Sequence, residues 1–458
     1  MQLYIKKINT GLYGRIFSIC VAIGVFIAFG FCWILNENTY KALSLLPVSY
    51  GLLYLLCSAN RRYLKNISLS IINISAFCRY IIYPIIITIT LNRGIYYEFD
   101  FRAICLLIYE LIGVFVVISL FAKKLGVEEK SYNIDSSIGI GNFSVGVLFL
   151  PLIILYPSLL TKFSISSEVS KSVIVPGVIE VVFTMGIWVI FIYLLGILSL
   201  QKFGSRWQNI VCFILVIVVA VYYILFNVIS GEDIKRWQII SCGIAMLYII
   251  LRLFPEKKKF VIIGGGLGIM VAVLLGSFIK FGLTFSFANF VNKYLELSHF
   301  TEYFGGMQNV TTALDLLLEH PHAQGIESTL TDLFSGVPIL SALFDYDTHA
   351  TAAIFQNHVN RTDIICPLTA QSVAHFGYIG TPVLGMLMTW LAITFNSALK
   401  RTNNLYAAYV LIEIVVFTSL YIELNTTIIL GRIWVRLMFL ILQMFDSMIR
   451  VRFKWGRM

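Results

Sequence analysis

Charged residues are scarce in this chain. Asp, Glu, Lys and Arg together make up 13% of its 458 residues, whereas apolar residues make up 59% and the mean hydropathy is +0.86. Soluble globular domains carry roughly 25% charged residues, so the composition excludes an ordinary soluble globule. It indicates an integral membrane protein that crosses the bilayer many times.

Motif-forming cysteines and histidines are also few. The eight cysteines form no CxxC pair, and all but Cys366 lie in or beside apolar segments, where a free thiol packs as a small apolar group. His320 and His322 stand close together, but no full set of metal ligands accompanies them. We therefore expect neither a disulfide framework nor a bound metal or other cofactor.

The basic surplus does not require nucleic acid as a partner. The net charge is +10, but Lys and Arg stand at the ends of apolar segments, where they set the orientation of membrane helices. Gly264–Gly268 looks like a phosphate loop, yet no strand precedes it and it lies inside an apolar segment. We expect these glycines to allow close helix packing, and we predict no nucleotide and no nucleic acid.

Apolar windows of about 16 to 25 residues recur twelve times, each long enough to cross the hydrocarbon core alone or with its flanks. They lie at Ile16–Leu35, Ala42–Ser58, Ile67–Leu91, Ala103–Ala122, Val145–Leu160, Val178–Leu200, Ile210–Ile229, Trp237–Phe254, Phe260–Ile279, Phe376–Leu399, Leu405–Leu424 and Thr427–Met448. The predicted fold class is an all-α integral membrane protein with about 12 transmembrane helices. A large loop of short helices is predicted between helices 9 and 10.

These windows divide the chain into three predicted regions. A nine-helix transmembrane region covers 1–280, the large loop covers 281–375, and a three-helix transmembrane region with a basic tail covers 376–458. Between the windows, Lys and Arg number twenty in one set of alternate loops and ten in the other. Because translocation of positive charge is disfavoured, both termini are predicted to be cytoplasmic and the large loop extracytoplasmic.

The large loop holds all six histidines, and nine acidic residues against two basic ones. Its apolar spacing predicts a helix on the membrane surface over Thr284–Phe300, a helix around Val310–Leu317 that Pro321 stops, and a piece over Leu330–Leu343 that is broken near Gly336. Loops on a rigid scaffold often carry function. The alternative is a plain solvated loop, since histidines are excluded from lipid in any case.

Asp345, Asp347 and His349 lie within five residues of one another in this loop. Carboxylates beside an imidazole favour its use as a general base. The alternative is a polar turn without chemistry.

Ionisable residues inside apolar windows are costly and mark either a functional site or a structural ion pair. They are Arg79, Glu110, Glu180, Arg252, Glu413, Arg432, Arg436 and Asp446. Arg79 and Glu110 are candidates for a mutual salt bridge.

Arg432 and Arg436 are one helical turn apart, on one face of the last window. Two stacked guanidinium groups would hold a diphosphate, which needs charge and several donors at once. The structural alternative is that either arginine pairs with Glu413 or Glu423.

The most informative segment is Arg361–Gly380, which runs from the loop into the tenth window. The residues that carry a motif there are Pro367, Thr369, Ser372 and Phe376-Gly377-Tyr378-Ile379-Gly380. In these residues the chain resembles the Wzy-type polymerases of O-antigen and capsular repeat units. Those proteins commonly end their large outer loop with a proline, a small polar cluster, an acidic residue and Phe-Gly-x-x-Gly. Gln371 stands where the acidic residue is expected, and Thr301–Gly306 resembles the Tyr- and Gly-rich entry of that loop.

The resemblance implies a GT-C-like membrane glycosyltransferase of the bacterial inner membrane. It would polymerise polyprenyl-diphosphate-linked oligosaccharide repeat units at the outer face, with one lipid-linked unit as donor and another as acceptor. The implied partners are these lipids, the bilayer and a chain-length regulator protein. The catalytic candidates are His349, Asp347, Asp345, His375 and Glu302, with His349 first and His375 second as general base. The candidates for binding the diphosphate or the substrate are Arg432, Arg436, Arg361, Arg79 and Tyr303.

Two other functions fit the same pattern of windows. A lipid-linked oligosaccharide flippase would also have about twelve spans, and the charged residues in the first half of the chain agree with it. An O-antigen ligase, which passes a finished glycan to a lipid core, would look nearly identical in sequence.

Overall fold

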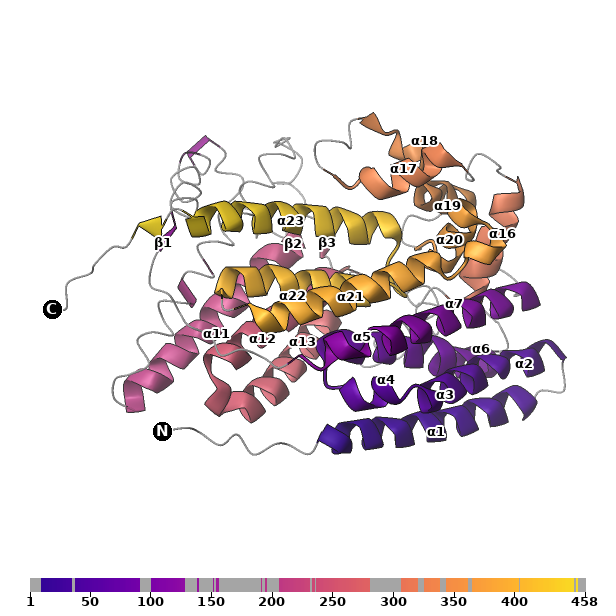
Figure 1. Cartoon of the computed structure of the whole chain (residues 1–458), viewed down its shortest axis with the longest axis horizontal. Coiled ribbons are helices and arrows are strands. Elements are labelled where there is room, and N and C mark those ends of the chain that lie inside the picture. Colours follow the sequence, from indigo (N-terminus) through magenta and orange to yellow (C-terminus); the bar gives the residue numbers. More distant parts are fainter. Residues whose placement is uncertain are drawn as a thin grey trace. The chain divides into compact units, whose positions relative to one another are not determined.

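The structure is a computed structural model, and its helices and strands are drawn in Figure 1. It describes residues 10–34, 38–90, 100–127, 138–139, 151, 154–155, 191, 194–195, 206–230, 233–234, 236–280, 306–319, 325–337, 343–360, 365–402, 404–448 and 450–451. The predicted windows Val145–Leu160 and Val178–Leu200 and the predicted surface helix Thr284–Phe300 therefore lie outside the described residues, apart from a few isolated positions.

The chain forms two compact units, and the first comprises Met1–Glu128, Val291–Ala398 and Ile414–Trp434. Its helices in the first segment are α1 (Thr10–Ile34), α2 (Asn38–Leu43), α3 (Leu45–Leu56), α4 (Ser58–Tyr63), α5 (Ile67–Phe77), η1 (Cys78–Ile82), α6 (Tyr83–Thr90), α7 (Phe101–Leu120) and α8 (Ala122–Leu125). Those that follow are α16 (Met307–Glu319), α17 (Ile326–Phe334), α18 (Tyr346–His349), α19 (Thr351–Val359), α20 (Leu368–Phe376), η7 (Tyr378–Gly380) and most of α21 (Val383–Arg401). The end of α22 (Leu405–Ser419) and the start of α23 (Thr426–Met448) also belong to it.

The second unit comprises Glu129–Phe290, Leu399–Glu413 and Val435–Met458. Its described helices are α11 (Arg206–Val228), α12 (Arg236–Leu253), η4 (Pro255–Lys257) and α13 (Lys258–Lys280), with the first part of α22 and the second part of α23. Two antiparallel pairs of very short strands complete it, β1 (Ile138–Gly139) with β4 (Arg450–Val451) and β2 (Ile229–Ser230) with β3 (Asp233–Ile234).

Several helices are long and apolar enough to cross a membrane, as the composition predicts. Among the described residues there are five, at Tyr13–Ile34, Ile67–Ile89, Phe101–Leu120, Trp207–Ile224 and Tyr378–Arg401. A sixth is obtained if α12 and α13, which meet at a bend of 114°, count together as one broken span. The all-α membrane class is thus in agreement with the described part of the chain, whereas the number twelve stays a prediction.

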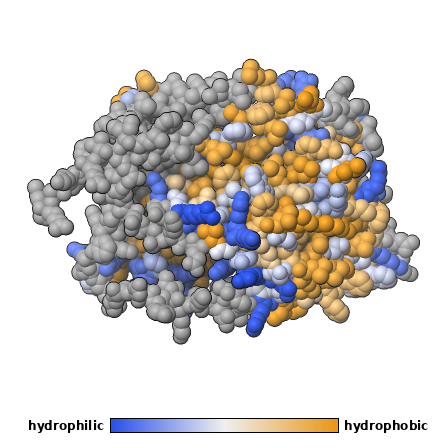
Figure 2. Space-filling view, viewed as in Figure 1, coloured by the Kyte–Doolittle hydropathy of each residue, from blue (hydrophilic) through white to orange (hydrophobic). Residues whose placement is uncertain are grey.

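The surface of the first unit exposes large apolar side chains that water would not favour. Ile23, Phe26 and Leu56 are 55%, 81% and 78% exposed, and Figure 2 shows hydrophobic residues spread over this face of α1 to α7. Contiguous apolar surface of this kind marks contact with another apolar phase. Lipid contact accounts for it, because a helix in a bilayer keeps its backbone polar groups bonded internally and can present apolar side chains on every side.

Close packing explains one of the four clustered glycines in α13. A Cβ built at Gly265 would lie 1.9 Å from Leu247 Cδ2 on α12, so the glycine lets the end of the Leu247 side chain pack closely on α13. Gly264, Gly266 and Gly268 meet nothing within 4 Å. The glycine run lies inside helix α13 and is not a phosphate loop, and the predicted close packing holds for Gly265 alone among these four glycines.

Two of the three predicted loop pieces correspond to described helices, and the described loop helices share a small apolar core. The helix predicted around Val310–Leu317 is α16, and the piece predicted to break near Gly336 is α17, which ends at Phe334. The core is formed by residues of α16, α19, α20 and the segment before α20, namely Ala313, Leu316, Ala352, Phe355, Cys366 and Ala370. Figure 1 shows these short helices grouped together in orange, and α16 and α20 also contact α7.

Candidate functional site

Helix α20 carries the polar residues around which the candidate site is built. It begins after Pro367 and ends at Gly377, whose φ of 70° lies in the left-handed region that favours glycine. The Phe-Gly dipeptide of the sequence motif is therefore the C-terminal end of this helix. Side chains of α20 reach α7, α17 and the start of α23, so the helix connects the loop to the membrane helices within the first unit.

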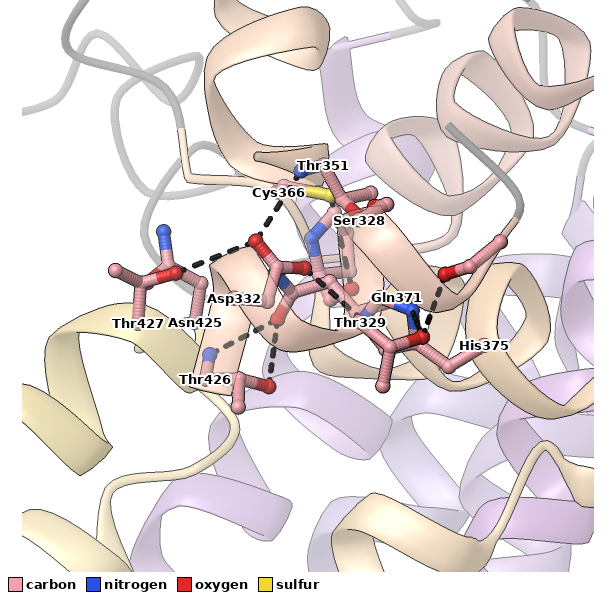
Figure 3. A network of polar contacts seen from close by, with 12 residues as sticks. Ser328, Thr329, Asp332, Thr351, Cys366, Gln371, His375, Asn425, Thr426 and Thr427 are labelled. Carbon is pink, nitrogen blue, oxygen red and sulfur yellow. Dashed lines mark hydrogen bonds and ion pairs between the residues drawn. The ribbon is translucent and has the colours of Figure 1, made fainter. Parts of the chain in front are cut away.

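Asp332 of α17 is a fully buried carboxylate at the centre of this network (Figure 3). Its Oδ1 accepts from the backbone N–H of Thr351 at 3.1 Å and from the Thr427 hydroxyl at 3.4 Å. Its Oδ2 lies 3.0 Å from both Gln371 Nε2 and His375 Nε2. Four contacts use most of the acceptor capacity of an ionised carboxylate, and they offset the cost of burying its charge.

The orientation of the Gln371 amide is fixed by the first turn of α23. Its Oε1 accepts from both the backbone N–H and the hydroxyl of Thr426, each at 2.9 Å. Because a backbone N–H can only donate, the oxygen of the amide must face Thr426 and its NH₂ group must face Asp332. Gln371 therefore donates a hydrogen bond to the carboxylate of Asp332.

The same logic fixes the tautomer of His375. Asp332 acts as an acceptor, so Nε2 of His375 carries the proton that points to Oδ2. In the neutral ring, Nδ1 is then the proton acceptor. It lies 3.0 Å from the Thr329 hydroxyl, which also lies 2.8 Å from the Gly325 carbonyl and can donate its single proton to either. The imidazole is thus an oriented base, with 2% of its side chain exposed.

Cys366 lies beside this network but does not supply a nucleophile. Burial raises the pKa of its thiol well above the ordinary value, and the charge of Asp332 adds to this rise. A thiol with a raised pKa stays protonated, and only the thiolate is a good nucleophile. Cys366 is part of the apolar core of the loop helices.

Thr369, on α20, joins a second buried group. Arg79 Nη1 lies 3.1 Å from Glu110 Oε2, which also accepts from the Thr369 hydroxyl at 2.7 Å. Arg79 Nη2 lies 3.3 Å from the same hydroxyl, and the side chains of Arg79 and Glu110 are each 1% exposed. The salt bridge considered from the sequence is therefore present. Arg79 lies on η1, a π-helical turn, and such turns in α-helices are frequent at functional sites.

Arg436 forms an ion pair with Glu413 in the second unit. Its Nε contacts Oε2 of the carboxylate and its Nη2 lies 3.2 Å from Oε1, which is a bidentate arrangement. Oε1 also accepts from the Tyr409 hydroxyl at 3.0 Å, and that hydroxyl lies 3.2 Å from the Tyr223 hydroxyl. Two roles were considered for Arg436, diphosphate binding and a structural ion pair. These contacts form the structural ion pair.

Arg432 lies on α23, about one and a half turns after Thr426 and Thr427, which contact Gln371 and Asp332. It is half-buried. The loop packs directly on this part of the helix, because Gly336 meets the backbone of Gly431 and the ring of Phe334 lies 6.4 Å from that of Trp434. This places Arg432 next to the contact between the loop and α23.

His349 has a more exposed position than His375. It lies at the end of α18 with 31% of its side chain exposed, and its Nε2 lies 3.4 Å from Glu327 Oε1, which is itself 72% exposed. Asp345 is exposed and accepts a backbone hydrogen bond from His349, whereas the side chain of Asp347 lies outside what the structure describes. An ion pair of this exposure orients a ring weakly.

Five of the residues considered from the sequence lie outside the described part of the chain: Glu302, Tyr303, His320, His322 and Arg361. Among the described residues, no group of three or more His, Cys, Asp or Glu side chains could hold a metal ion.

Asp332 is the residue that sequence reasoning missed. The family motif has an acidic residue near position 371, within α20, where this chain has Gln371. The structure brings a carboxylate to the same place from α17, 39 residues earlier in the chain. The available signal was that Asp332 occurs on an amphipathic loop helix, at a position surrounded by apolar and small residues.

Comparisons with known protein families, with curated proteins and with solved structures find no match for this chain.

Proposed function

We propose that this protein is a membrane glycosyltransferase that joins polyprenyl-diphosphate-linked oligosaccharide repeat units into O-antigen or capsular polysaccharide. The reaction would take place at the outer face of a bacterial inner membrane. The observation that carries the proposal is the oriented pair of Asp332 and His375, because His375 belongs to the segment in which the chain resembles the Wzy-type polymerases. The apolar helices agree with substrates that are anchored in lipid.

His375 is the general base in this proposal. The acceptor sugar hydroxyl takes the place of the Thr329 hydroxyl at Nδ1, while Thr329 donates to the Gly325 carbonyl. As the hydroxyl oxygen forms a bond to the anomeric carbon of the donor, its proton moves to Nδ1 and the bond from that carbon to the diphosphate breaks. The polyprenyl diphosphate leaves with the electron pair. Asp332 stabilises the imidazolium that forms and holds the ring in position.

The geometry favours His375 over His349 for this task. The carboxylate partner of His375 is buried and bound by three further donors, whereas Glu327 beside His349 is exposed. A fixed imidazole is a more efficient base than a mobile one, because proton transfer depends on the orientation of the ring. The exposed N-terminal half of α17, which includes Ile326 and Leu330, is the side from which the acceptor reaches Thr329.

Arg432 is the diphosphate ligand that the described residues favour, with Arg361 as the second candidate. Arg79 and Arg436 lie in buried ion pairs with Glu110 and Glu413, and this proposal gives these two pairs a structural role. Arg432 lies on the helix whose first turn contacts Gln371, which keeps the diphosphate and the base within one unit. A guanidinium fork suits a diphosphate oxygen pair better than an ammonium does.

Purified protein and the lipid-linked repeat unit alone test the proposal. We expect a ladder of glycan lengths, and we expect His375→Ala to lower its formation by roughly 10²–10⁴-fold, as is usual for loss of a general base. His358→Ala is the matched control, because His358 is also in the loop but pairs with the exposed Glu319. A normal ladder from His375→Ala would remove this residue from the mechanism.

The same assay separates the alternatives. A ligase would transfer glycan only when a lipid-core acceptor is added, without elongating the lipid-linked unit. A flippase would form no glycosidic bond under either condition, and it would move labelled lipid between the leaflets of a vesicle. Either result would contradict the proposed polymerisation.

A further inference from the structure

The first unit also buries two carboxylates around one arginine, in addition to Asp332. Arg79 and Glu110 are each 1% exposed, and Glu423, in the turn between α22 and α23, is 2% exposed. Glu423 accepts a hydrogen bond from the Ser75 hydroxyl and interacts electrostatically with Arg79. We call Arg79, Glu110, Glu423 and Thr369 the Arg79 cluster.

The formal charge of the Arg79 cluster does not balance when both carboxylates are ionised. One guanidinium then faces two carboxylates, which leaves one negative charge in excess. The titratable or polar side chains that border the cluster from each described element are Ser75 on α5, Cys78 and Tyr80 on η1, Tyr83 on α6, and Tyr421 beside Glu423. None of these described neighbours is a cation. A buried charge without a partner is strongly unfavourable, and such a group binds a proton instead.

Hydrogen bonding shows which oxygen atoms are left without donors. Glu110 Oε1 and Glu423 Oε2 are both buried, and neither has a hydrogen-bond partner among the described residues. Oε1 of Glu110 points toward α21, where a Cβ at Gly385 would lie 3.0 Å from it. An ionised oxygen in such a place loses its hydration without compensation, whereas a neutral carboxyl group loses much less.

The two carboxylates differ in how strongly neighbouring groups stabilise their ionised forms. Glu110 Oε2 accepts hydrogen bonds from Arg79 Nη1 at 3.1 Å and from the Thr369 hydroxyl at 2.7 Å. These two donors stabilise its ionised form directly. Glu423 accepts hydrogen bonds from two neutral donors, the Ser75 hydroxyl and its own backbone N–H, and Arg79 acts on it without a direct hydrogen bond to Glu423 among those described. We propose that the Arg79 cluster is a proton-binding site, and that Glu423 holds the proton at neutral pH.

Infrared spectroscopy of the purified full-length protein tests this directly. A protonated carboxylic acid has a C=O stretch apart from the amide and carboxylate bands, and that stretch shifts in D₂O. We expect such a band in the wild-type protein at pH 7 and its loss in Glu423→Gln. Glu319→Gln is the control, because Glu319 is 63% exposed. Absence of the band in the wild type, or its persistence in Glu423→Gln, would overturn the proposal.

Thermal unfolding gives a second readout that does not depend on a band assignment. Because glutamine resembles a protonated glutamate, Glu423→Gln should leave Tm unchanged. Glu110→Gln removes the counter-ion of Arg79 and should lower Tm by roughly 5 °C. A loss of stability in Glu423→Gln as large as that in Glu110→Gln would mean that Glu423 is ionised in the folded protein, and the proposal would be wrong.

Discussion

The carboxamide of Gln371 donates to the carboxylate of Asp332 across 3.0 Å, and together the two side chains occupy the place where a single acidic residue was expected. The amide links the loop helix α17 to the first turn of α23 through Thr426. Asp332 in turn holds His375. The base of the proposed reaction thus depends on three segments that are far apart in sequence.

Exchanging the two functional groups tests whether the position of the charge matters. In the double variant Asp332→Asn with Gln371→Glu, the new amide at 332 can donate to the new carboxylate at 371, which still accepts from Thr426. The amide would also donate to Nε2 of His375, so the proton of the ring moves to Nδ1. We expect glycan polymerisation to fall as far as in His375→Ala, with a Tm close to that of the wild type.

The nitrogen chemical shifts of labelled histidine report the tautomer of His375 in this double variant. The single variant Asp315→Asn, at an exposed position on α16, is the control for removing one carboxylate from the loop helices. Full activity in the double variant would show that the network has only a structural role.

Arg432→Lys should impair polymerisation while the protein accumulates normally. The lysine keeps the charge but loses the planar fork that binds two diphosphate oxygens, so we expect weaker binding of the lipid-linked donor and a higher KM. The measurement is initial rate against the concentration of the lipid-linked unit. Arg252→Lys is a suitable control, because Arg252 stacks on Tyr248 and bonds to the Leu399 carbonyl in the second unit. Unchanged kinetics for Arg432→Lys would exclude a specific role in diphosphate binding.

Arg436→Met should mainly reduce stability. It leaves Glu413 buried at 0% exposure without its cation. Removing one partner of a buried pair costs about 3–5 kcal/mol, so we expect low accumulation in the membrane. Adding Glu413→Gln should restore much of it, because the tyrosines around the carboxylate can also bond to an amide. If Arg436→Met accumulates normally but does not polymerise, Arg436 belongs to the substrate site after all.

Reporter fusions test the predicted orientation. A fusion after Glu327 should be active only outside the cytoplasm, and a fusion after Lys258 only inside it, because the basic residues divide twenty to ten between the two sets of loops. Cytoplasmic activity of the first fusion would contradict both the orientation and the proposed function, since the loop would then face away from the lipid-linked units.

Hydropathy and local spacing predicted several of the described helices. The apolar windows at Ile16–Leu35 and Ala103–Ala122 correspond to α1 and α7, and the amphipathic spacing around Val310–Leu317 corresponds to α16. Such patterns are local, because a helix that faces lipid needs only a run of apolar residues. The window Ala42–Ser58 is divided into α2 and α3, a break that its composition does not indicate.

The candidate site could be predicted only in part. His375 was identified because it lies in the motif, and the salt bridges of Arg79 and Arg436 were foreseen as alternatives because charges inside apolar windows need partners. Asp332 was not identified, because its contacts with Gln371 and His375 span 39 and 43 residues and depend on how α17 packs on α20. Spacing within one segment carries no information about such contacts.

The direction in which Arg79 points depends on the number of residues in the π-helical turn Cys78–Ile82, which contains it. A π-turn holds one residue more than the α-helical ladder around it needs. Deleting a single residue there would restore a continuous α-helix between α5 and α6 and turn one part against the other by roughly 100°, the rotation per residue of an α-helix. The guanidinium would then face away from Glu110 and Thr369 with every polar side chain of the cluster still present. A one-residue deletion could thus remove the ion pair as completely as replacing the arginine.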